Sequence, residues 1–197
     1  MKILALDTST SRVTVALLDG EKVISEKIGG DLTGAQFHGE LLVDLVREVL
    51  DGVKPERIAV GIGPGPYTGL RVGITTAEVL AAAWGIDVVG TPTLAALAHG
   101  HVRRGGEKGT AILDVKRKEI ACQDFDSTGK LLGEPSLIHI TEFESQNFSN
   151  LVGPAFITQT LISPTVSDPS PVDAIDIAIL GQSETPKPFK PLYLRQP

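Results

Sequence analysis

The chain has 197 residues, of which 42% are hydrophobic, and a formal net charge of −6. Its single cysteine, Cys122, excludes an internal disulfide and a thiolate metal cluster built by this chain alone. The acidic balance disfavours general attraction to nucleic acid, which depends on clustered lysine and arginine. The first apolar run is too short for a signal peptide, and no membrane span is indicated, so we expect a cytoplasmic protein.

Three β-strands are predicted at the start of the chain. Ile3 to Leu6, Val13 to Leu18 and Lys22 to Ile28 have strand composition, and Asp19–Gly20 is a strong tight-turn signal between the second and third. A helix is then predicted over 35–51. Its apolar residues cover an arc of about 200°, twice what a surface helix needs, so one sheet cannot cover it.

A short strand, a glycine-rich turn and a long apolar helix follow. Ile58 to Ile62 is an apolar run without alternation, typical of a strand buried on both faces. The turn contains GPGPYTG, and Thr68 can cap a helix over 69–84 that ends before Gly85. Small residues recur at every fourth position of this helix, at Gly69, Gly73, Ala77 and Ala81, and we expect this ridge to admit another backbone.

The next elements complete a first lobe. Val88–Val89 predicts a buried strand, and Thr91 with Pro92 predicts the start of a helix over 93–99, closed by Gly100. The alternation of strands and helices indicates an α/β fold with a mixed sheet. Composition turns to glycine and charge near residue 104, so we expect two lobes, 1–104 and 105–197.

The opening pattern returns in the second half of the chain. Each copy has an apolar strand that ends in Asp7 or Asp114, followed twelve positions later by a second aspartate, Asp19 or Asp126. This repeat favours two duplicated lobes. The alternative is two unrelated β-meanders that look alike. Further on, 172–180 predicts a helix, and the terminal PKPFKPLYLR predicts an extended strap across the body.

The residues bear on four kinds of site chemistry. The glycine turn lacks the spacing of a P-loop or a dinucleotide fingerprint. The turn after Asp7 is rich in hydroxyls and could hold a phosphate or a metal, or could only satisfy its own backbone. The four histidines lack the spacing of a zinc hydrolase, and no nucleophile elbow is present.

Five segments together resemble the bacterial TsaB (YeaZ) family: ILALDTST, GPGPYTGLRVG, VVGTPTLAALA, LDVKRKEI and the terminal PLYLR. The resemblance implies an actin-like ATPase superfamily fold (ASKHA) with two ribonuclease-H-like lobes. It also implies a role in threonylcarbamoylation of the adenosine beside the tRNA anticodon, as the non-catalytic partner of a paralogue, TsaD.

The same resemblance bears on ligands. Catalytic relatives carry H-x-x-x-H for a metal where this chain has Thr93 and Leu97, and they place glycine soon after the second-lobe aspartate where it has Val115. Half a phosphate clamp remains at Asp7, Thr8, Ser9 and Thr10. We therefore expect weak or no nucleotide binding, no metal and no resident cofactor.

The excess apolar surface of the two long helices predicts an interface made by a helix pair meeting a matching pair. The candidate interface residues are Phe37, Leu41, Leu45, Gly69, Val72, Gly73, Thr76, Ala77, Val79 and Ala83. The expected partners are TsaD, a second copy through the same helices, and an ATPase subunit, TsaE, with tRNA reached only through the complex. The alternative is an ATP-dependent phosphotransferase or acyltransferase that acts alone.

Overall fold

The computed structural model describes residues 1–30, 38–143, 148, 150–154, 166–168 and 172–194. Its strands are β1 Lys2–Asp7, β2 Val13–Asp19, β3 Lys22–Gly29, β4 Arg57–Gly61, β5 Asp87–Thr91, β6 Gly109–Asp114, β7 Glu119–Phe125, β8 Ser136–His139, β9 Leu151–Val152 and β10 Val166–Asp168. Its helices are α1 His38–Leu50, α2 Tyr67–Trp84, α3 Thr93–Arg103, α4 Ile140–Phe143 and α6 Ala174–Ser183.

Two five-stranded sheets have the same strand order. The first runs β3-β2-β1-β4-β5 and the second runs β8-β7-β6-β9-β10. In each sheet the first three strands are antiparallel, and the central strand pairs in parallel with the fourth. Identical order and direction confirm the α/β fold of two ribonuclease-H-like lobes and the duplication that the repeated meander predicted.

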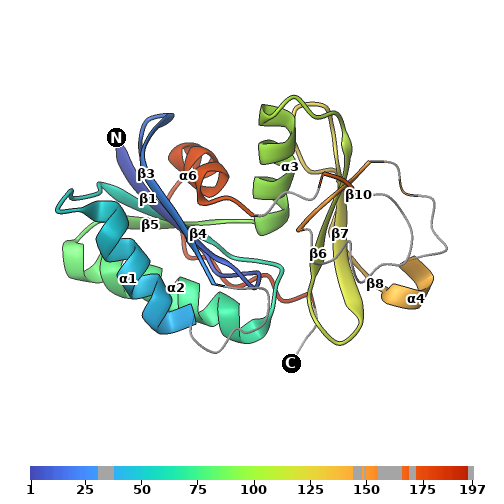
Figure 1. Cartoon of the computed structure of the whole chain (residues 1–197), viewed down its shortest axis with the longest axis horizontal. Coiled ribbons are helices and arrows are strands. Elements are labelled where there is room, and N and C mark those ends of the chain that lie inside the picture. The colour runs from blue at the N-terminus through green and yellow to red at the C-terminus, as the bar shows by residue number, and fades with distance from the viewer. Residues whose placement is uncertain (31–37, 144–147, 149, 155–165, 169–171, 195–197) are drawn as a thin grey trace.

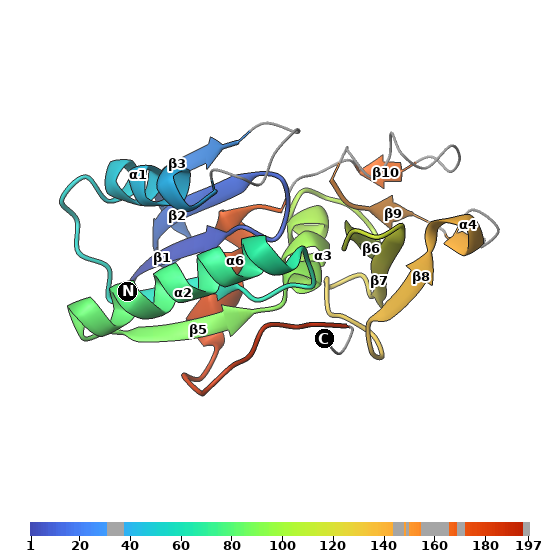
Figure 2. The ribbon, with the colours of Figure 1, turned by 90° about the horizontal axis from the view of Figure 1, so that it is seen from below.

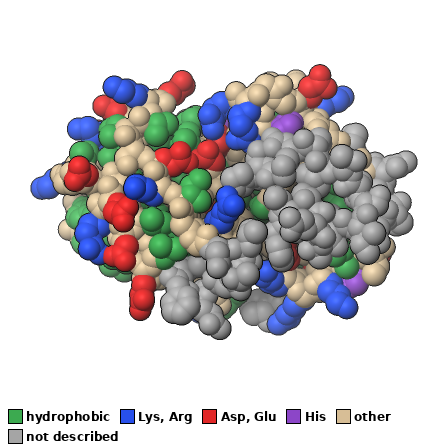
Figure 3. All heavy atoms as spheres, in the orientation of Figure 1, with side chains coloured by type: hydrophobic (Ala, Val, Ile, Leu, Met, Phe, Trp, Pro, Cys, Tyr) green, Lys and Arg blue, Asp and Glu red, His purple; other side chains and the backbone are tan. Residues whose placement is uncertain are grey.

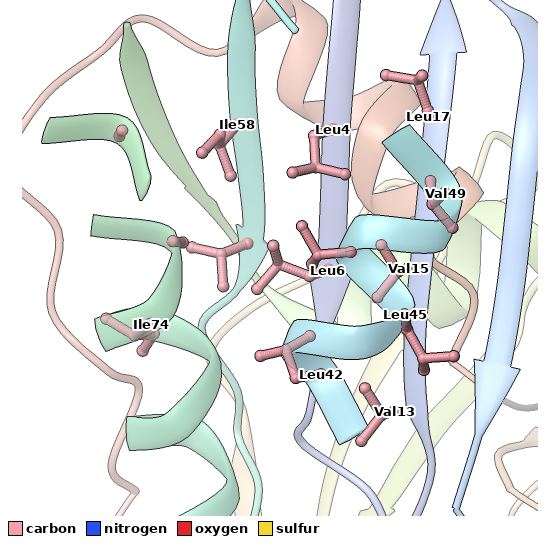
Figure 4. Close-up of a cluster of buried hydrophobic side chains, with 14 of the residues drawn as sticks. Leu4, Leu6, Val13, Val15, Leu17, Leu42, Leu45, Val49, Ile58 and Ile74 are labelled. Atoms are coloured by element: carbon pink, nitrogen blue, oxygen red, sulfur yellow. The ribbon is translucent and has the colours of Figure 1, made fainter. Parts of the chain in front are cut away.

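Helices α1 and α2 cover one face of the first sheet, and α6 covers the other (Figure 1, Figure 2). The α1–α2 side is filled by leucine, isoleucine and valine from both layers, as Figure 4 shows for Leu6, Leu42 and Val49. The α6 side has a smaller core of mostly alanine and isoleucine, including Ala16 and Ile177. Both faces are buried, as the apolar runs in β1 and β4 predict.

Helix α3 joins the two lobes. Its Ala96 belongs to the core under α6, whereas Leu94 and Leu97 pack with Phe125 and other residues of the second sheet. The helix was expected to end before Gly100 but continues to Arg103. Gly100 serves close packing instead, because an added Cβ would lie 2.4 Å from Asp176 Oδ2.

The C-terminal segment returns to the first lobe. Helix α6 packs against β1, β2 and β4, and Leu192 N donates to Ile62 O at 2.8 Å. The ring of Tyr193 stacks on Tyr67, with centroids 5.2 Å apart. The predicted strap is thus confirmed. We therefore propose that the first lobe consists of residues 1–104 together with α6 and the strap. The second lobe is then the part of 105–197 that precedes α6.

Two helix starts differ from the expectation. Helix α2 begins at Tyr67 with Pro66 at the N-cap, so Thr68 is not the cap, and α3 likewise begins after Pro92 rather than with Thr91 as its cap. At the other end, Gly85 caps α2 in the left-handed conformation, as predicted. Among the described residues, no helix combines the length and apolar character needed to cross a membrane.

Candidate functional site

The predicted phosphate hairpin follows β1 and is built around the Asp7 carboxylate. Asp7 Oδ1 accepts from Ser9 N at 2.8 Å and from Ser9 Oγ at 2.6 Å, while Asp7 Oδ2 accepts from Thr93 Oγ1 at 3.1 Å. Asp7, Thr8 and Ser9 are each only 1% exposed. The carboxylate therefore ties the hairpin to the start of α3.

The glycine turn reaches the same place from β4. Thr93 accepts from Gly63 N at 3.1 Å through its hydroxyl, and Thr93 N donates to Gly63 O at 2.8 Å. Thr8 Oγ1 donates to Gly69 O at 2.7 Å. The hairpin, the glycine turn, α2 and α3 thus meet in one hydrogen-bonded cluster.

Glycine is required here by close approach. A Cβ at Gly61 would lie 1.8 Å from Asp7 Oδ2, and one at Gly73 would lie 2.3 Å from Thr8 Oγ1. Such distances are too short for any side chain, so the hairpin can seat only against glycine. In the small-residue ridge of α2, Gly69 and Gly73 face Thr8 of the same chain, while Ala77 and Ala81 lie in the hydrophobic core. The ridge is therefore filled from within the chain.

The hydroxyls of the hairpin donate hydrogen bonds to groups within the same chain. Thr8 and Ser9 donate to Gly69 O and to Asp7, and Thr10 Oγ1 donates to Arg12 O at 3.3 Å. To bind a phosphate, these hydroxyl groups would have to break their internal hydrogen bonds and donate to the ligand instead. Binding at Asp7, Thr8, Ser9 and Thr10 stays a prediction, and the present arrangement supports the expectation that it is weak.

The two positions at which the resemblance implies metal-binding histidines in catalytic relatives, Thr93 and Leu97, are both buried. Thr93 is fully buried and bonded to Asp7, and Leu97 packs in the core of the second lobe. No group of three or more His, Cys, Asp or Glu suited to a metal occurs among the described residues.

The predicted interface residues divide into two sets. Leu45, Gly69, Gly73 and Ala77 are buried within the chain, so we remove them from the proposed contact surface. Leu41, Val72 and Thr76 are partly exposed, and Val79 and Ala83 are exposed. Phe37 lies outside the described residues.

Two further exposed apolar residues belong to this surface and were not predicted. Val43 of α1 is 53% exposed and Trp84 of α2 is 40% exposed, beside Val79 at 60%. The sequence did indicate an exposed apolar surface here, because both helices are too apolar to be covered by a single sheet. The missing information was the rotation of each helix on the sheet, which decides which residues face outward. Leu41 reaches Gly29 of β3, where an added Cβ would lie 3.1 Å from its Cδ1, so it is left out. We call Val43, Val72, Thr76, Val79, Ala83 and Trp84 the α1–α2 surface.

A charged cluster lies where α3 meets α6. Buried Asp176 accepts from Arg103 Nε at 2.9 Å and contacts His99 Nδ1 at 2.7 Å. Burial alone would raise the pKa of Asp176, but the hydrogen bonds from His99 and Arg103 outweigh it and lower that pKa. The carboxylate is therefore ionised and holds the two helices together.

The counterpart of the hairpin in the second lobe is a basic turn. Lys116, Arg117 and Lys118 are exposed and have φ of 68°, 58° and 62°. Asp114 Oδ1 accepts from Lys116 N at 2.7 Å, as Asp7 accepts from Ser9. Bulky side chains thus stand where nucleotide-binding relatives are expected to have glycine.

Comparison with known proteins identifies relatives. Residues 33–159 match the family model described as TsaD, tRNA N6-adenosine threonylcarbamoyltransferase. The chain is 29% identical over 154 residues to the Escherichia coli tRNA threonylcarbamoyladenosine biosynthesis protein TsaB, covering 71% of this chain and 65% of that protein.

Two solved structures are similar over nearly the whole chain. YeaZ from Pseudomonas aeruginosa is 25% identical with a TM-score of 0.72, covering 92% of this chain and 91% of YeaZ. A protein described as uncharacterized with similarity to peptidase YEAZ from Pseudomonas aeruginosa is 26% identical with a TM-score of 0.77, covering 98% of this chain and 99% of that one. These likenesses extend over both lobes.

Proposed function

The chain belongs to the TsaB (YeaZ) family of tRNA threonylcarbamoyladenosine biosynthesis proteins, and from this premise we propose that it is a non-catalytic subunit that binds and activates TsaD. The proposed contact is the α1–α2 surface. The family and its pathway follow from the comparisons, whereas the scaffold role and the partner are our inference from the surface and the hairpin.

The observation that carries the proposal is the exposed apolar side of α1 and α2. Val43, Val79 and Trp84 present large side chains to solvent on two adjacent helices, next to the small Ala82 and Ala83. A pair of helices with such a face is typical of half a helical bundle. Because large exposed apolar patches are uncommon on monomers, a second protein is expected to cover this one.

The interior of the first lobe supports a non-catalytic role. The donors of the Asp7 hairpin are used inside the chain, and Thr93 and Leu97 replace metal-binding histidines of the catalytic relatives. Catalysis would then depend on the partner's own site. This chain would contribute by positioning or stabilising that partner.

The same surface has more than one candidate occupant. A homodimer through α1 and α2 would compete with the TsaD complex, because both would bury the same side chains. TsaE could bind the complex, and tRNA would be reached through it. We place this assembly in the cytoplasm.

The test is co-elution of the full-length chain with TsaD from the same organism. Val79→Asp places a charge in the centre of the proposed contact and should abolish co-elution, since burying an unpaired carboxylate costs several kcal/mol. Leu132→Asp is the matched control, because Leu132 is 48% exposed in the second lobe. It should leave co-elution unchanged.

Two results would count against the proposal. Unchanged co-elution of Val79→Asp would exclude this surface as the contact. Threonylcarbamoyl transfer by the isolated chain, or ATP binding that is lost in Asp7→Ala, would favour the alternative of an enzyme that acts alone.

A further inference from the structure

One strip of the first sheet is left uncovered on the face that carries α6. Helix α6 packs mainly on β1, β2 and β4, so the edge strand β3 extends beyond it (Figure 1). Three of the exposed large hydrophobic residues lie on this strand: Val23 at 39%, Ile24 at 44% and Ile28 at 46%. A sheet face with this composition is normally covered.

The strand register places Val23, Glu26 and Ile28 on the same face. Val23 pairs with Leu18, Glu26 with Ala16 and Ile28 with Thr14, and Leu18 and Ala16 belong to the core beneath α6. The register shift opposite Leu17 and Leu18 inserts Ile24 as an extra residue in the strand. We call Val23, Ile24, Glu26 and Ile28 the β3 strip.

Glu26 lies in the middle of the strip. The positive charge near it does not balance its own carboxyl and that of Asp173. Its carboxyl hydrogen-bonds that of Asp173, the N-cap of α6. Burial, together with repulsion from Asp173, raises the pKa of Glu26 to about 7. The cations that face it are shared, since Arg103 bonds Asp176 and reaches Asp173 Oδ2 only at 3.7 Å.

The apolar and acidic groups are neighbours on the surface. Figure 3 shows hydrophobic and acidic side chains side by side over the part of the first lobe where Figure 1 places β3 and α6, with basic side chains towards α3. His99 contacts Asp176, so it does not neutralise Glu26. A cation brought by another molecule would relieve the two carboxyls.

We propose that the β3 strip is a docking surface for a protein segment that presents a lysine or arginine between apolar side chains. The apolar residues would cover Val23, Ile24 and Ile28. The basic group would pair with Glu26 and Asp173, whose neighbouring carboxyls otherwise have to share a proton or repel each other. Charge complementarity thus selects the occupant, and the apolar flanks supply burial.

Charge disfavours the other occupants. A second copy docked by two-fold symmetry on this strip would bring Glu26 towards Glu26, which adds like charge to an already acidic pair. Nucleic acid and anionic lipid are repelled for the same reason. The occupant is therefore a different, locally basic protein segment.

This surface is independent of the proposed TsaD contact. The β3 strip and α6 lie on one face of the first sheet, whereas the α1–α2 surface lies on the other (Figure 1). Both could be occupied at once. The inference can therefore fail while the proposed function holds, or the reverse.

The test is selection of displayed random peptides on the immobilised full-length chain, followed by affinity measurement with the enriched peptides. We expect enriched peptides to carry a lysine or arginine flanked by apolar residues. Glu26→Gln should weaken their binding about tenfold, and Glu26→Lys should abolish it and select acidic peptides instead. Binding to the natural chain should also weaken from pH 8 to pH 6, because Glu26 becomes protonated.

Two control variants make the result specific. Ile24→Ser with Ile28→Ser should weaken binding, and Val79→Asp on the opposite face should leave it unchanged. The inference is overturned if no peptide is enriched, if enriched peptides lack a basic residue, or if Glu26→Lys binds them as well as the natural chain. Concentration-dependent dimerisation that is lost with Ile24→Ser and Ile28→Ser would assign the strip to a second copy and overturn it also.

Discussion

The two lobes contain the same turn with different surroundings. After β1 and after β6 an aspartate accepts the backbone N–H two residues on, at 2.8 Å in Asp7 and 2.7 Å in Asp114. The other oxygen of Asp7 meets buried Thr93, whereas that of Asp114 meets the exposed Lys116 Nζ at 3.1 Å. One local motif is therefore part of the core in the first lobe and a surface turn in the second.

This difference indicates that the first-lobe hairpin stabilises the fold. Its polar groups are satisfied by the glycine turn and α3, so removal of any one leaves buried groups unpaired. The second-lobe turn has solvent as an alternative partner. Substitutions should therefore be far more costly at the first turn than at the second.

The largest effect is expected for Gly61→Ala. Its Cβ would lie 1.8 Å from Asp7 Oδ2, so the hairpin or β4 must move, and we expect a loss of about 4 kcal/mol or failure to fold. Gly39→Ala is the control, because Gly39 is an exposed residue of α1 with open space around it, and it should stabilise by about 0.5–1 kcal/mol. Denaturant unfolding measures both. Equal stability of the two variants would contradict the role of the close approach.

Next in size is the matched pair Asp7→Ala and Asp114→Ala. Asp7→Ala leaves the buried Ser9 and Thr93 donors unpaired and should cost about 3 kcal/mol. Asp114→Ala should cost under about 1 kcal/mol, because its partner Lys116 is exposed. Chemical denaturation of the two variants side by side checks this, and similar losses would remove the distinction between the lobes.

A smaller effect depends on pH and concerns Glu26, on the third strand of the first sheet. Because the pKa of Glu26 is raised from 4.5 to about 7 in the folded protein, the folded state binds the extra proton between those values, and stability falls as pH rises through this window. Glu26→Gln should therefore stabilise at pH 8, by about 1 kcal/mol after solvent screening, and have no such benefit below pH 4.5.

The measurement for Glu26 is the thermal unfolding midpoint at pH 8 and pH 4. Glu21→Gln, on the exposed turn before β3, is the matched control and should shift neither midpoint. A Glu26→Gln benefit of the same size at both pH values would show that charge is not the cause.

The smallest effect is expected for Arg117→Gly in the basic turn. Arg117 has φ of 58°, a left-handed conformation that costs about 1 kcal/mol for a residue with a side chain. Glycine removes that cost but makes the unfolded chain more flexible, so we expect a net gain of about 0.5 kcal/mol. Differential scanning calorimetry detects it, and a net loss would mean that the side chain contributes contacts that offset the strain.

Much of the fold could be predicted from local patterns. The Asp19–Gly20 turn, the apolar run of β4 and the Gly85 cap each have a local physical cause that the sequence displays. Gly100 misled the prediction of the end of α3, because a glycine needed for close packing has the same appearance as one that ends a helix. Thr68 likewise misled the prediction of the start of α2, since a hydroxyl near the start of a helix need not cap that helix.

The candidate sites were only partly predictable. The sequence identified α1 and α2 as too apolar for one sheet, but it did not show which residues face outward, so buried Leu45 was included and exposed Val43 and Trp84 were missed. The β3 strip was not predicted at all. Its exposure follows from where α6 lies, and that helix is about 150 residues away in the chain.

Local sequence patterns were enough to predict the order and type of the first-lobe elements, the duplication of the meander and the family resemblance, because these depend on periodicity, turn chemistry and motif spacing. Three contacts became known only from the folded structure: Thr8 against Gly69 and Gly73, Asp7 with Thr93, and Glu26 with Asp173. Each of these contacts joins residues far apart in the chain, and their distance and burial are set by how helices are seated on the sheet. A local sequence pattern does not show how the helices pack on the sheet.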